Sequence, residues 1–428
     1  MPSNEERPIG SGVRRLRDVS AFPRARMSAT ALAPARFNLR GLSVVSMAHG
    51  LSDFYSGIVP FTIFLVLSRG HISPAFQGAF VFLWYFTSSI VQPFFGAFTD
   101  RHGRWWFLPA SIALTVIAIS CAGAAPTLPL LALCIVVGGF GSALMHPEAG
   151  KLSAMLSGPK RASGISIFQI GGQVGYSAGP AVIALLYARY GTGGSLWLLV
   201  PGLLGVGGLF AVMRRVDRSA ARDHASHARA ATMASADVDR IGVSLLVAST
   251  ALRHFVSAAF VTYLPNLLVA RGASIPQAGQ VVTAFLLISA IGLLAGGSLS
   301  DRFGAIRVSI AALVAAVPLL FAFFFTPVAI AVPALMLASV LLAVQNAPGV
   351  AIVQTMLPKN LGMALGLMNG VAFGFGSAAV AGIGFVVAGA GPAVALESVS
   401  AVPLLAALAY VAVARRIPAP NAKRVSAS

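Results

Sequence analysis

The sequence predicts an all-α integral membrane protein with twelve transmembrane helices, arranged as two six-helix halves. Of its 428 residues, 57% are hydrophobic and 10% are charged, whereas about a quarter of the residues of a soluble domain are charged. Apolar runs of about 20 residues, enough to cross a hydrocarbon core of about 30 Å, recur along the chain. A loop motif also repeats at a fixed offset, which indicates two related halves.

The predicted helices follow one another between breaks at charges, prolines and glycines. Their ranges are 41–68, 75–99, 105–124, 127–156, 163–188, 193–213, 242–270, 275–299, 307–326, 328–356, 360–388 and 392–414. A polar cytoplasmic linker, 214–241, joins the N-terminal half (41–213) to the C-terminal half (242–414). Residues 1–40 are expected to be a disordered cytoplasmic tail and 415–428 a second cytoplasmic tail, with Met27 as an alternative start of the chain.

The basic residues predict how the chain is oriented in the membrane. If the helices alternate in direction, 26 of the 30 Lys and Arg residues fall on one side; Arg69, Arg189 and Arg271 fall on the other, and Arg253 lies within a helix. This is the positive-inside distribution, so both termini are expected in the cytoplasm. This distribution explains the formal charge of +18, so the charge does not indicate a nucleic-acid-binding protein.

The repeated motif reads G-x-x-x-D-R-x-G between the second and third helices and again between the eighth and ninth. Each residue has a counterpart 201 positions later: Gly96 and Gly297, Asp100 and Asp301, Arg101 and Arg302, Gly103 and Gly304. The same offset relates Pro147 to Pro348. Tandem halves of this kind place a binding site between them, near the middle of the membrane.

These loops resemble those of the major facilitator superfamily. Within it, the segments MAHGLSDF, HPEAGKLSAMLSG, FQIGGQVGYSAGP and LGMALGLMNGVAFGFG are similar to the fosmidomycin-resistance exporters. The resemblance covers nearly the whole chain after residue 41. It implies an efflux protein of the bacterial inner membrane that exchanges a small-molecule substrate for protons, with the first, fourth, seventh and tenth helices lining the cavity.

Three of the twelve acidic residues lie within predicted helices: Asp53, Glu148 and Glu397. An ionisable residue at membrane depth is costly and is a functional candidate by default. Asp53 is about 18 Å into the first helix, close to the middle, and is the first candidate for a proton carrier. Burial penalises its charged form and a nearby cation favours it. The alternative is a permanent ion pair with Arg253, whereas Glu397, near an outer helix end, is expected to be solvated.

Arg253 and His254 lie at a similar depth in the seventh helix, and His254 is the counterpart of Asp53 at the 201-residue offset. Because arginine does not lose its proton in proteins, Arg253 is a candidate to bind an anionic substrate or to pair with Asp53. His254 is a candidate for proton coupling, since histidine titrates near neutral pH. Packing of His254 against a neighbouring helix is the alternative.

The stretch SALMHPEAGK places further candidates in the fourth helix. Glu148 and His146, on different faces, are candidates for proton transfer or gating. Lys151 follows Glu148 by three residues on the same face, so a structural ion pair is the alternative. Pro147 removes one helical hydrogen bond and, with Pro348, predicts paired hinges in the fourth and tenth helices.

Uncharged amides in three helices can bind a ligand or join helices to one another. The substrate-binding candidates are Gln345 and Asn346 of the tenth helix, Gln169 of the fifth, where Gln173 is a further amide, and Asn369 of the eleventh. The cavity position that the resemblance gives to the tenth helix favours the first two.

Glycines and the repeated loops are expected to carry the conformational change. In GGQVGYSAGP, Gly171, Gly175 and Gly179 form one stripe before Pro180, where another backbone can approach closely. This segment resembles the fifth-helix motif of major facilitator antiporters, and GVAFGFG resembles a matching surface in the eleventh helix.

The first copy of the repeated loop is expected to matter more for gating. Asp100 could meet the positive N-terminal end of the eleventh helix in the closed gate, with Arg101 and Arg104 bridging helix ends. The other gating candidates are Gly96, Gly103, Asp301 and Arg302.

The leading prediction is a monomeric, proton-driven, alternating-access exporter of a small drug or metabolite, with Asp53 and Glu148 as proton carriers. The alternative is an importer or uniporter of a small organic anion. A membrane enzyme is disfavoured, because H-E-x-x-H is absent and His146 and Glu148 lie on different faces of their helix. The phosphate-binding loop of ATP-driven pumps is absent as well. No metal or cofactor is expected, since Cys121 and Cys134 lie in apolar helices.

Overall fold

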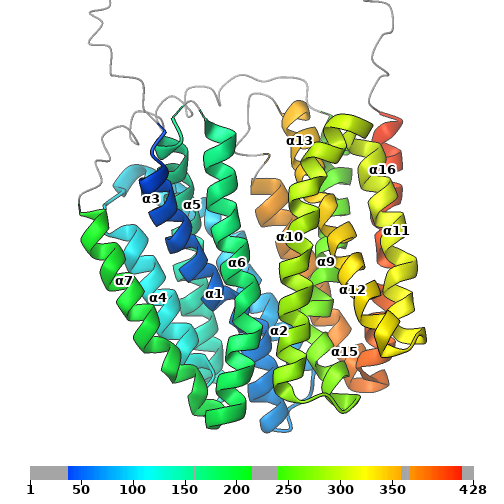
Figure 1. Cartoon of the computed structure of the whole chain (residues 1–428), viewed down its shortest axis with the longest axis horizontal. Helices are drawn as coiled ribbons and strands as arrows, with labels where there is room; N and C mark the ends of the chain where they lie inside the picture. Colours follow the sequence, from blue (N-terminus) through cyan, green and yellow to red (C-terminus); the bar gives the residue numbers. More distant parts are fainter. Residues whose placement is uncertain (1–36, 159, 215–238, 358–363, 365, 417–428) are drawn as a thin grey trace, which may run out of the picture.

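The computed structural model describes residues 37–158, 160–214, 239–357, 364 and 366–416, and the regular secondary structure within these ranges is helical. Most of the predicted linker and of both predicted tails lies outside these residues. Figure 1 shows the helices side by side in one bundle, with the start of α1 and the end of α16 at the same end.

The first half begins with α1 (Leu39–Arg69), whose first turn is capped by the Asn38 side chain. The chain continues through α2 (Ala75–Tyr85), a π-helical turn η1 (Phe86–Ile90), α3 (Gln92–His102), α4 (Phe107–Ala122), α5 (Leu128–Leu156), α6 (Arg161–Tyr190), a 3₁₀ segment η2 (Gly191–Leu198) and α7 (Leu199–Met213). The second half consists of α9 (Arg240–Ala270), α10 (Ile275–Phe303), α11 (Ala305–Phe325), α12 (Val328–Val344), α13 (Asn346–Met356), a π-helical turn η4 (Gly366–Val371), α15 (Ala372–Val399) and α16 (Val402–Ala414).

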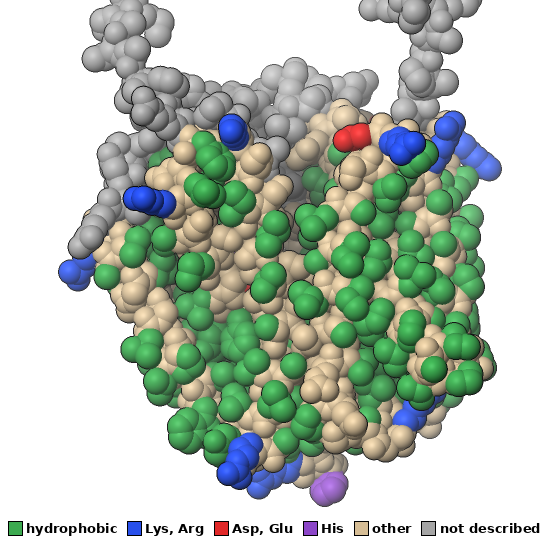
Figure 2. Space-filling model, in the orientation of Figure 1, with side chains coloured by type: hydrophobic (Ala, Val, Ile, Leu, Met, Phe, Trp, Pro, Cys, Tyr) green, Lys and Arg blue, Asp and Glu red, His purple; other side chains and the backbone are tan. Residues whose placement is uncertain are grey.

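Nine segments of the described chain are long and apolar enough to cross a membrane, and Phe107–Ala122 is a shorter apolar helix. Two of the nine, Ser163–Met213 with 51 residues and Gly366–Ala414 with 49, are each long enough for two crossings of roughly 20 residues. On the face shown in Figure 2, hydrophobic side chains cover the middle while Lys and Arg side chains lie near the two ends. The all-helical membrane class is therefore supported. The count of twelve crossings and the cytoplasmic termini stay predictions.

The two predicted hinge prolines have different effects. The backbone of α12 ends at Val344 and α13 begins at Asn346. Pro348 has no N–H group, so the carbonyl of Val344, four residues earlier, has no helical donor. By contrast, α5 is continuous through Pro147. The helical hydrogen bonding is thus interrupted at only one of the two prolines, in the second half. Gln345 keeps helical backbone angles between α12 and α13, and Val328–Met356 forms one apolar span, as predicted for 328–356.

Glycines bring α1 and α6 into backbone contact. A Cβ atom on Gly175 would lie 2.0 Å from the carbonyl oxygen of Gly50, and a Cβ on Gly57 would lie 2.1 Å from that of Tyr176. The predicted stripe therefore allows close approach, and its partner is a helix of the same half. In the second half, Gly376 of α15 faces the backbone of α9 in the same way, 2.6 Å from the carbonyl oxygen of Ala251.

The halves meet where α2 packs on α15 and α6 packs on α10. Gln77, at the start of α2, donates from Nε2 to the carbonyl oxygen of Thr262 at 2.5 Å. Ala181 of α6 donates its N–H to Thr283 Oγ1 of α10 at 3.0 Å. Because α2 begins where α1 ends, the Gln77 contact lies at the end of the bundle opposite the start of α1.

Candidate functional site

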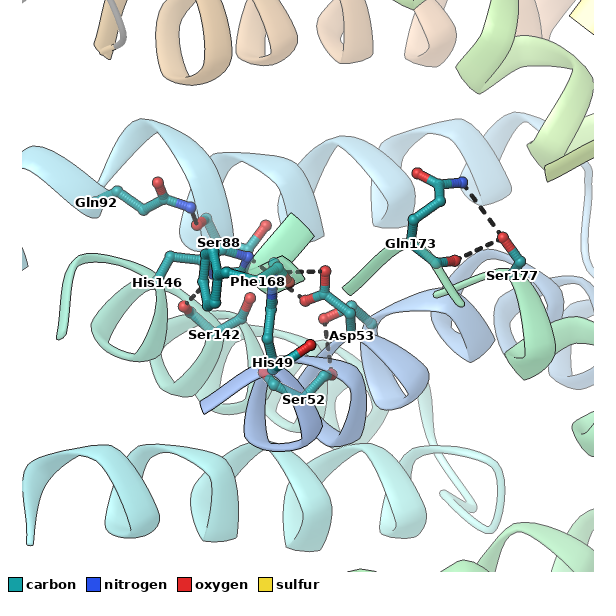
Figure 3. A network of polar contacts seen from close by, with 12 residues as sticks. His49, Ser52, Asp53, Ser88, Gln92, Ser142, His146, Phe168, Gln173 and Ser177 are labelled. Carbon is teal, nitrogen blue, oxygen red and sulfur yellow. Dashed lines mark hydrogen bonds and ion pairs between the residues drawn. The ribbon is translucent and has the colours of Figure 1, made fainter. Parts of the chain in front are cut away.

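A carboxylate meets two imidazoles in the interior of the first half, as Figure 3 shows. His49 and Asp53 lie one turn apart on α1, and His146 comes from α5. His49 Nε2 is 3.1 Å from Asp53 Oδ2, and His146 Nε2 is 3.4 Å from Asp53 Oδ1. The exposed fractions of the His49, Asp53 and His146 side chains are 5%, 15% and 28%. We call these three residues the histidine–aspartate cluster.

Backbone carbonyls fix the orientation of both rings. His49 Nδ1 lies 2.8 Å from the carbonyl oxygen of Phe168, and His146 Nδ1 lies 2.8 Å from that of Ser142. A carbonyl only accepts, so each Nδ1 carries the hydrogen and each Nε2 faces Asp53. The His49 ring stacks on Phe168 at 4.0 Å. Gly172 leaves room for it, because a Cβ there would lie 2.3 Å from the ring.

This arrangement can hold and release a proton. With neutral rings and an ionised Asp53, the cluster carries one negative charge, and one added proton shared between Nε2 and a carboxylate oxygen makes it neutral. The three ligand atoms lie within 4.8 Å of one another, so these residues could also hold a divalent metal ion. Proton and metal would compete for the same atoms, and metal analysis of the purified protein distinguishes the two.

Arg253 of α9 is 5% exposed and is not paired with Asp53. Its Nε and Nη2 atoms are buried and have no hydrogen-bond partner in the described part of the chain. The Arg253 guanidinium lies over the Phe373 ring, with Cζ 5.8 Å from the ring centre. The expectation of an Asp53–Arg253 ion pair is therefore wrong for this conformation, because His49 and His146 take both carboxylate oxygens.

His254 packs between helices, as the second of its two interpretations predicted. Its ring stacks on Phe373 at 4.2 Å, and its Nε2 is 3.1 Å from Ser377 Oγ. The Tyr85 ring from α2 meets it edge-on at 5.1 Å. Tyr85 Oη is also 3.0 Å from Tyr176 Oη. Tyr85 therefore connects the first half to the aromatic residues beside Arg253.

Comparison with known proteins now identifies the family. The model of the Major Facilitator Superfamily matches residues 42–245 and again 246–428. The chain belongs to the major facilitator superfamily. Its members are transporters that work by alternating access, and the chain is a transporter rather than an enzyme.

Two curated superfamily relatives cover most of the chain. YfnC of Bacillus subtilis, described as an uncharacterized transporter of this type, is 28% identical over 383 residues, which are 86% of this chain and 91% of YfnC. The fosmidomycin resistance protein of Escherichia coli is 26% identical over 370 residues, 84% of this chain and 89% of that protein.

Solved structures of other transporters share the fold. The nucleoside transporter NupG has a TM-score of 0.67 and 14% identity, covering 88% of this chain and 100% of NupG. A D-xylose–proton symporter has a TM-score of 0.65 and 15% identity, covering 86% of this chain and 96% of the symporter. At this identity, the likeness concerns the fold alone.

The superfamily's loop motif is joined to α5 by a lysine. Lys151 Nζ contacts Asp100 Oδ1 and lies 3.6 Å from Glu148 Oε1, and it donates to Thr99 Oγ1 at 2.7 Å. Glu148 is 5% exposed. The predicted pair of Glu148 with Lys151 is present, and it lies at the loop rather than beside Asp53. The start of the predicted eleventh helix, which Asp100 was expected to meet, lies outside the described residues.

The remaining gating candidates lie at the surface, in the α3–α5 contact or in the α6–α10 contact. Arg101, Arg104, Asp301 and Arg302 are exposed. Gly96 faces Pro147, whose Cβ would be 3.6 Å from a Cβ on the glycine. Pro180 lies inside α6, where its carbonyl oxygen faces Gly279 of α10.

The amide candidates separate into two groups. Gln345 is 1% exposed and donates from Nε2 to Thr250 Oγ1 at 3.3 Å and Tyr410 Oη at 3.0 Å, while its Oε1 is buried without a partner in the described chain. Asn346 is half-buried beside it, whereas Gln169 and Asn369 are exposed.

His49 and Tyr85 were missed as candidates. His49 precedes Asp53 by four residues, a spacing that puts both on one helix face, so this signal was present in the segment MAHGLSDF. Tyr85 had no such signal, because an aromatic residue in an apolar helix is ordinary and its place between the halves depends on how α2 packs.

Proposed function

We propose that this transporter is a proton-coupled antiporter that exports a small drug or metabolite across the bacterial inner membrane. The histidine–aspartate cluster is the observation that carries the proposal. Its carboxylate lies in the interior, and its two histidines give a proton alternative positions within hydrogen-bonding reach. The fosmidomycin resistance protein among the relatives supports efflux of a small drug.

In this mechanism, protonation removes the net charge of the cluster. A charged group is costly to enclose away from water, so the neutral cluster favours conformations in which the cavity is closed over it. Loss of the proton on the cytoplasmic side restores the charge and lets the empty transporter bind substrate again. Proton entry from one side and release to the other then drives substrate outward. Lys151, Asp100 and Glu148 at the loop would act as the gate.

Reconstituted protein tests this proposal. Fosmidomycin and a panel of small drugs are loaded into proteoliposomes, and substrate movement is measured with and without an imposed pH gradient. We expect Asp53→Asn to abolish gradient-driven transport, because an amide cannot carry the proton. Glu397→Gln is the matched control, a helical carboxylate far from the cluster in sequence. Gradient-driven transport that survives Asp53→Asn at the wild-type rate would rule out this proton site.

An importer or uniporter of a small organic anion is the second candidate, favoured by the unpartnered Arg253 guanidinium. Counterflow distinguishes the two candidates. A uniporter exchanges labelled for unlabelled substrate without any response to a pH gradient. The antiporter should accumulate substrate on one side only when protons move down an imposed gradient in the opposite direction.

A further inference from the structure

Arg253 is a buried cation for which the described chain supplies no counter-charge. It lies 13 residues after the first residue of α9 and 17 before the last, so about 20 Å or more of helix separates it from either end. No hydrogen bond or ion pair joins it to another described residue, and its Nε and Nη2 are buried without a partner. A buried charge in this state costs several kcal/mol, which a bound anion would offset.

The packing around Arg253 leaves one edge of the guanidinium without a hydrogen-bond partner in the described chain. Phe373 covers a face of the group, with Cζ 5.8 Å from the ring centre. The same ring stacks on His254, which is fixed by Ser377. An aromatic face satisfies the charge in part and accepts no in-plane hydrogen bond. Nε–H and an Nη2–H point from the same edge, and two parallel N–H donors match two oxygens of one oxyacid group.

A second unsatisfied atom lies on the same side of α9. Gln345 donates to Thr250 Oγ1, and Thr250 precedes Arg253 by three residues, which places both on one helix face. The amide nitrogen of Gln345 is fully used by Thr250 and Tyr410, whereas its Oε1 is buried without a partner. The described chain thus leaves two arginine donors and one amide acceptor unmatched along this face.

We propose that Arg253 and Gln345 form a binding subsite for a small oxyacid. The carboxylate, phosphonate or phosphate group accepts from Nε and Nη2 of Arg253, and a hydroxyl or N–H group of the same molecule donates to Gln345 Oε1. The distance of Arg253 from both ends of α9 favours a free molecule over a lipid headgroup. Only the identification of this oxyacid as the transported substrate rests on the proposed function.

Calorimetry on detergent-solubilised protein tests the subsite without requiring transport. The probes are 2-hydroxyethylphosphonate, ethylphosphonate without the hydroxyl, 3-hydroxypropionate, and the neutral diethyl ethylphosphonate. We expect the hydroxyl-bearing acids to bind more tightly than ethylphosphonate, and the diester not to bind. Dihexanoyl phosphatidic acid is the lipid arm. Binding of this lipid with no binding of the free acids, or equal binding of the diester, would overturn the proposal.

Variants distinguish recognition by the two parallel N–H donors of Arg253, the donor fork, from attraction by its positive charge alone. Arg253→Lys keeps the charge but loses the fork, and we expect about 10- to 100-fold weaker binding, the loss typical of charge-assisted hydrogen bonds. Gln345→Met should remove the preference for the hydroxyl group. Arg271→Lys is the matched control, because Arg271 also lies over a phenylalanine ring, with Cζ 5.6 Å from the Phe323 centre, but at the end of α9.

Thermal unfolding distinguishes a ligand-binding arginine from a structural one. Replacing an unpaired buried charge with an apolar side chain of similar length removes its desolvation cost. Arg253→Met should therefore raise the melting temperature of the ligand-free protein and abolish its further rise with 2-hydroxyethylphosphonate. A lower melting temperature, with ligand stabilisation equal to that of the wild type, would show that Arg253 has only a structural role.

Discussion

At the scale of single residues, a carboxylate between two imidazoles differs from an isolated carboxylate at the same depth. The carboxylate oxygens of Asp53 lie 3.1 Å from His49 Nε2 and 3.4 Å from His146 Nε2, and backbone carbonyls fix the orientation of both rings. His49 is enclosed, whereas His146 is 28% exposed. In the proposed mechanism, a proton would therefore arrive by way of His146 and be held between Asp53 and His49, so the two histidines would have different roles.

Asp53 could be predicted from the sequence because acidic residues are rare inside apolar helices. Its partners were harder to predict. His146 was singled out only as a candidate for proton transfer or gating. Arg253 was suggested as the partner of Asp53 because it lies at a similar depth, next to His254, the counterpart of Asp53 at the 201-residue offset. That offset compares depth along two helices and contains no information on the direction in which a side chain points, so the pairing within the first half could not be inferred from it.

Gly172 provides a test of the His49 position. A methyl group there would meet three ring atoms of His49 at 2.3 to 2.7 Å, so Gly172→Ala must displace the ring. We expect about 10- to 100-fold slower proton-driven transport, the effect of losing one charge-assisted hydrogen bond, and a similar loss in His49→Gln. Gly207→Ala is the control, because nothing lies within 4 Å of a Cβ at that position. Wild-type proton uptake in both cluster variants would contradict the role of His49.

At the scale of helices, the close contact of α1 with α6 positions the cluster. His49 and Asp53 lie on α1, and Phe168 and Gly172, which hold the His49 ring, lie on α6. The glycine stripe of α6 was visible in the sequence because glycines recur every four residues. Its partner helix was not, since a stripe of small residues fits any backbone that approaches it.

Gly175→Ala should separate these helices. Its Cβ would lie 2.0 Å from the carbonyl oxygen of Gly50, a backbone atom that cannot rotate away. Overpacking of this kind costs about 1–3 kcal/mol, so we expect a lower melting temperature in detergent and weaker transport. Gly208→Ala on α7 has open space around the added methyl group and should be neutral or slightly stabilising. Equal melting temperatures for the two variants would show that α1 and α6 can move apart without cost.

At the scale of the whole molecule, the repeat in the sequence predicted two halves, but it could not predict which end of the interface is closed. Both conformations are formed by the same sequence and the same helices, and their difference in free energy depends on which contacts form between the halves. In this conformation those contacts include Gln77 with Thr262 and Ala181 with Thr283. The halves are therefore joined at the end opposite the loop that holds Asp100 and Lys151.

Gly78 is the position where a single change should shift this equilibrium. A Cβ on Gly78 of α2 would lie 2.4 Å from the carbonyl oxygen of Val380 in α15 and 2.5 Å from Tyr263 Oη. Gly78→Leu should therefore disfavour this closed contact and increase the population that is open at this end. Each 1.4 kcal/mol of added strain changes the ratio of the two conformations about tenfold.

Spin labels at His102 and Thr355, one in each half and both at the end far from Gly78, should then lie closer together, because alternating access closes one end as the other opens. Gly297→Leu, at a site with nothing within 4 Å of its Cβ, should leave the distance between the labels unchanged. An unchanged distance in Gly78→Leu as well would show that the contact of α2 with α15 does not control which end is open.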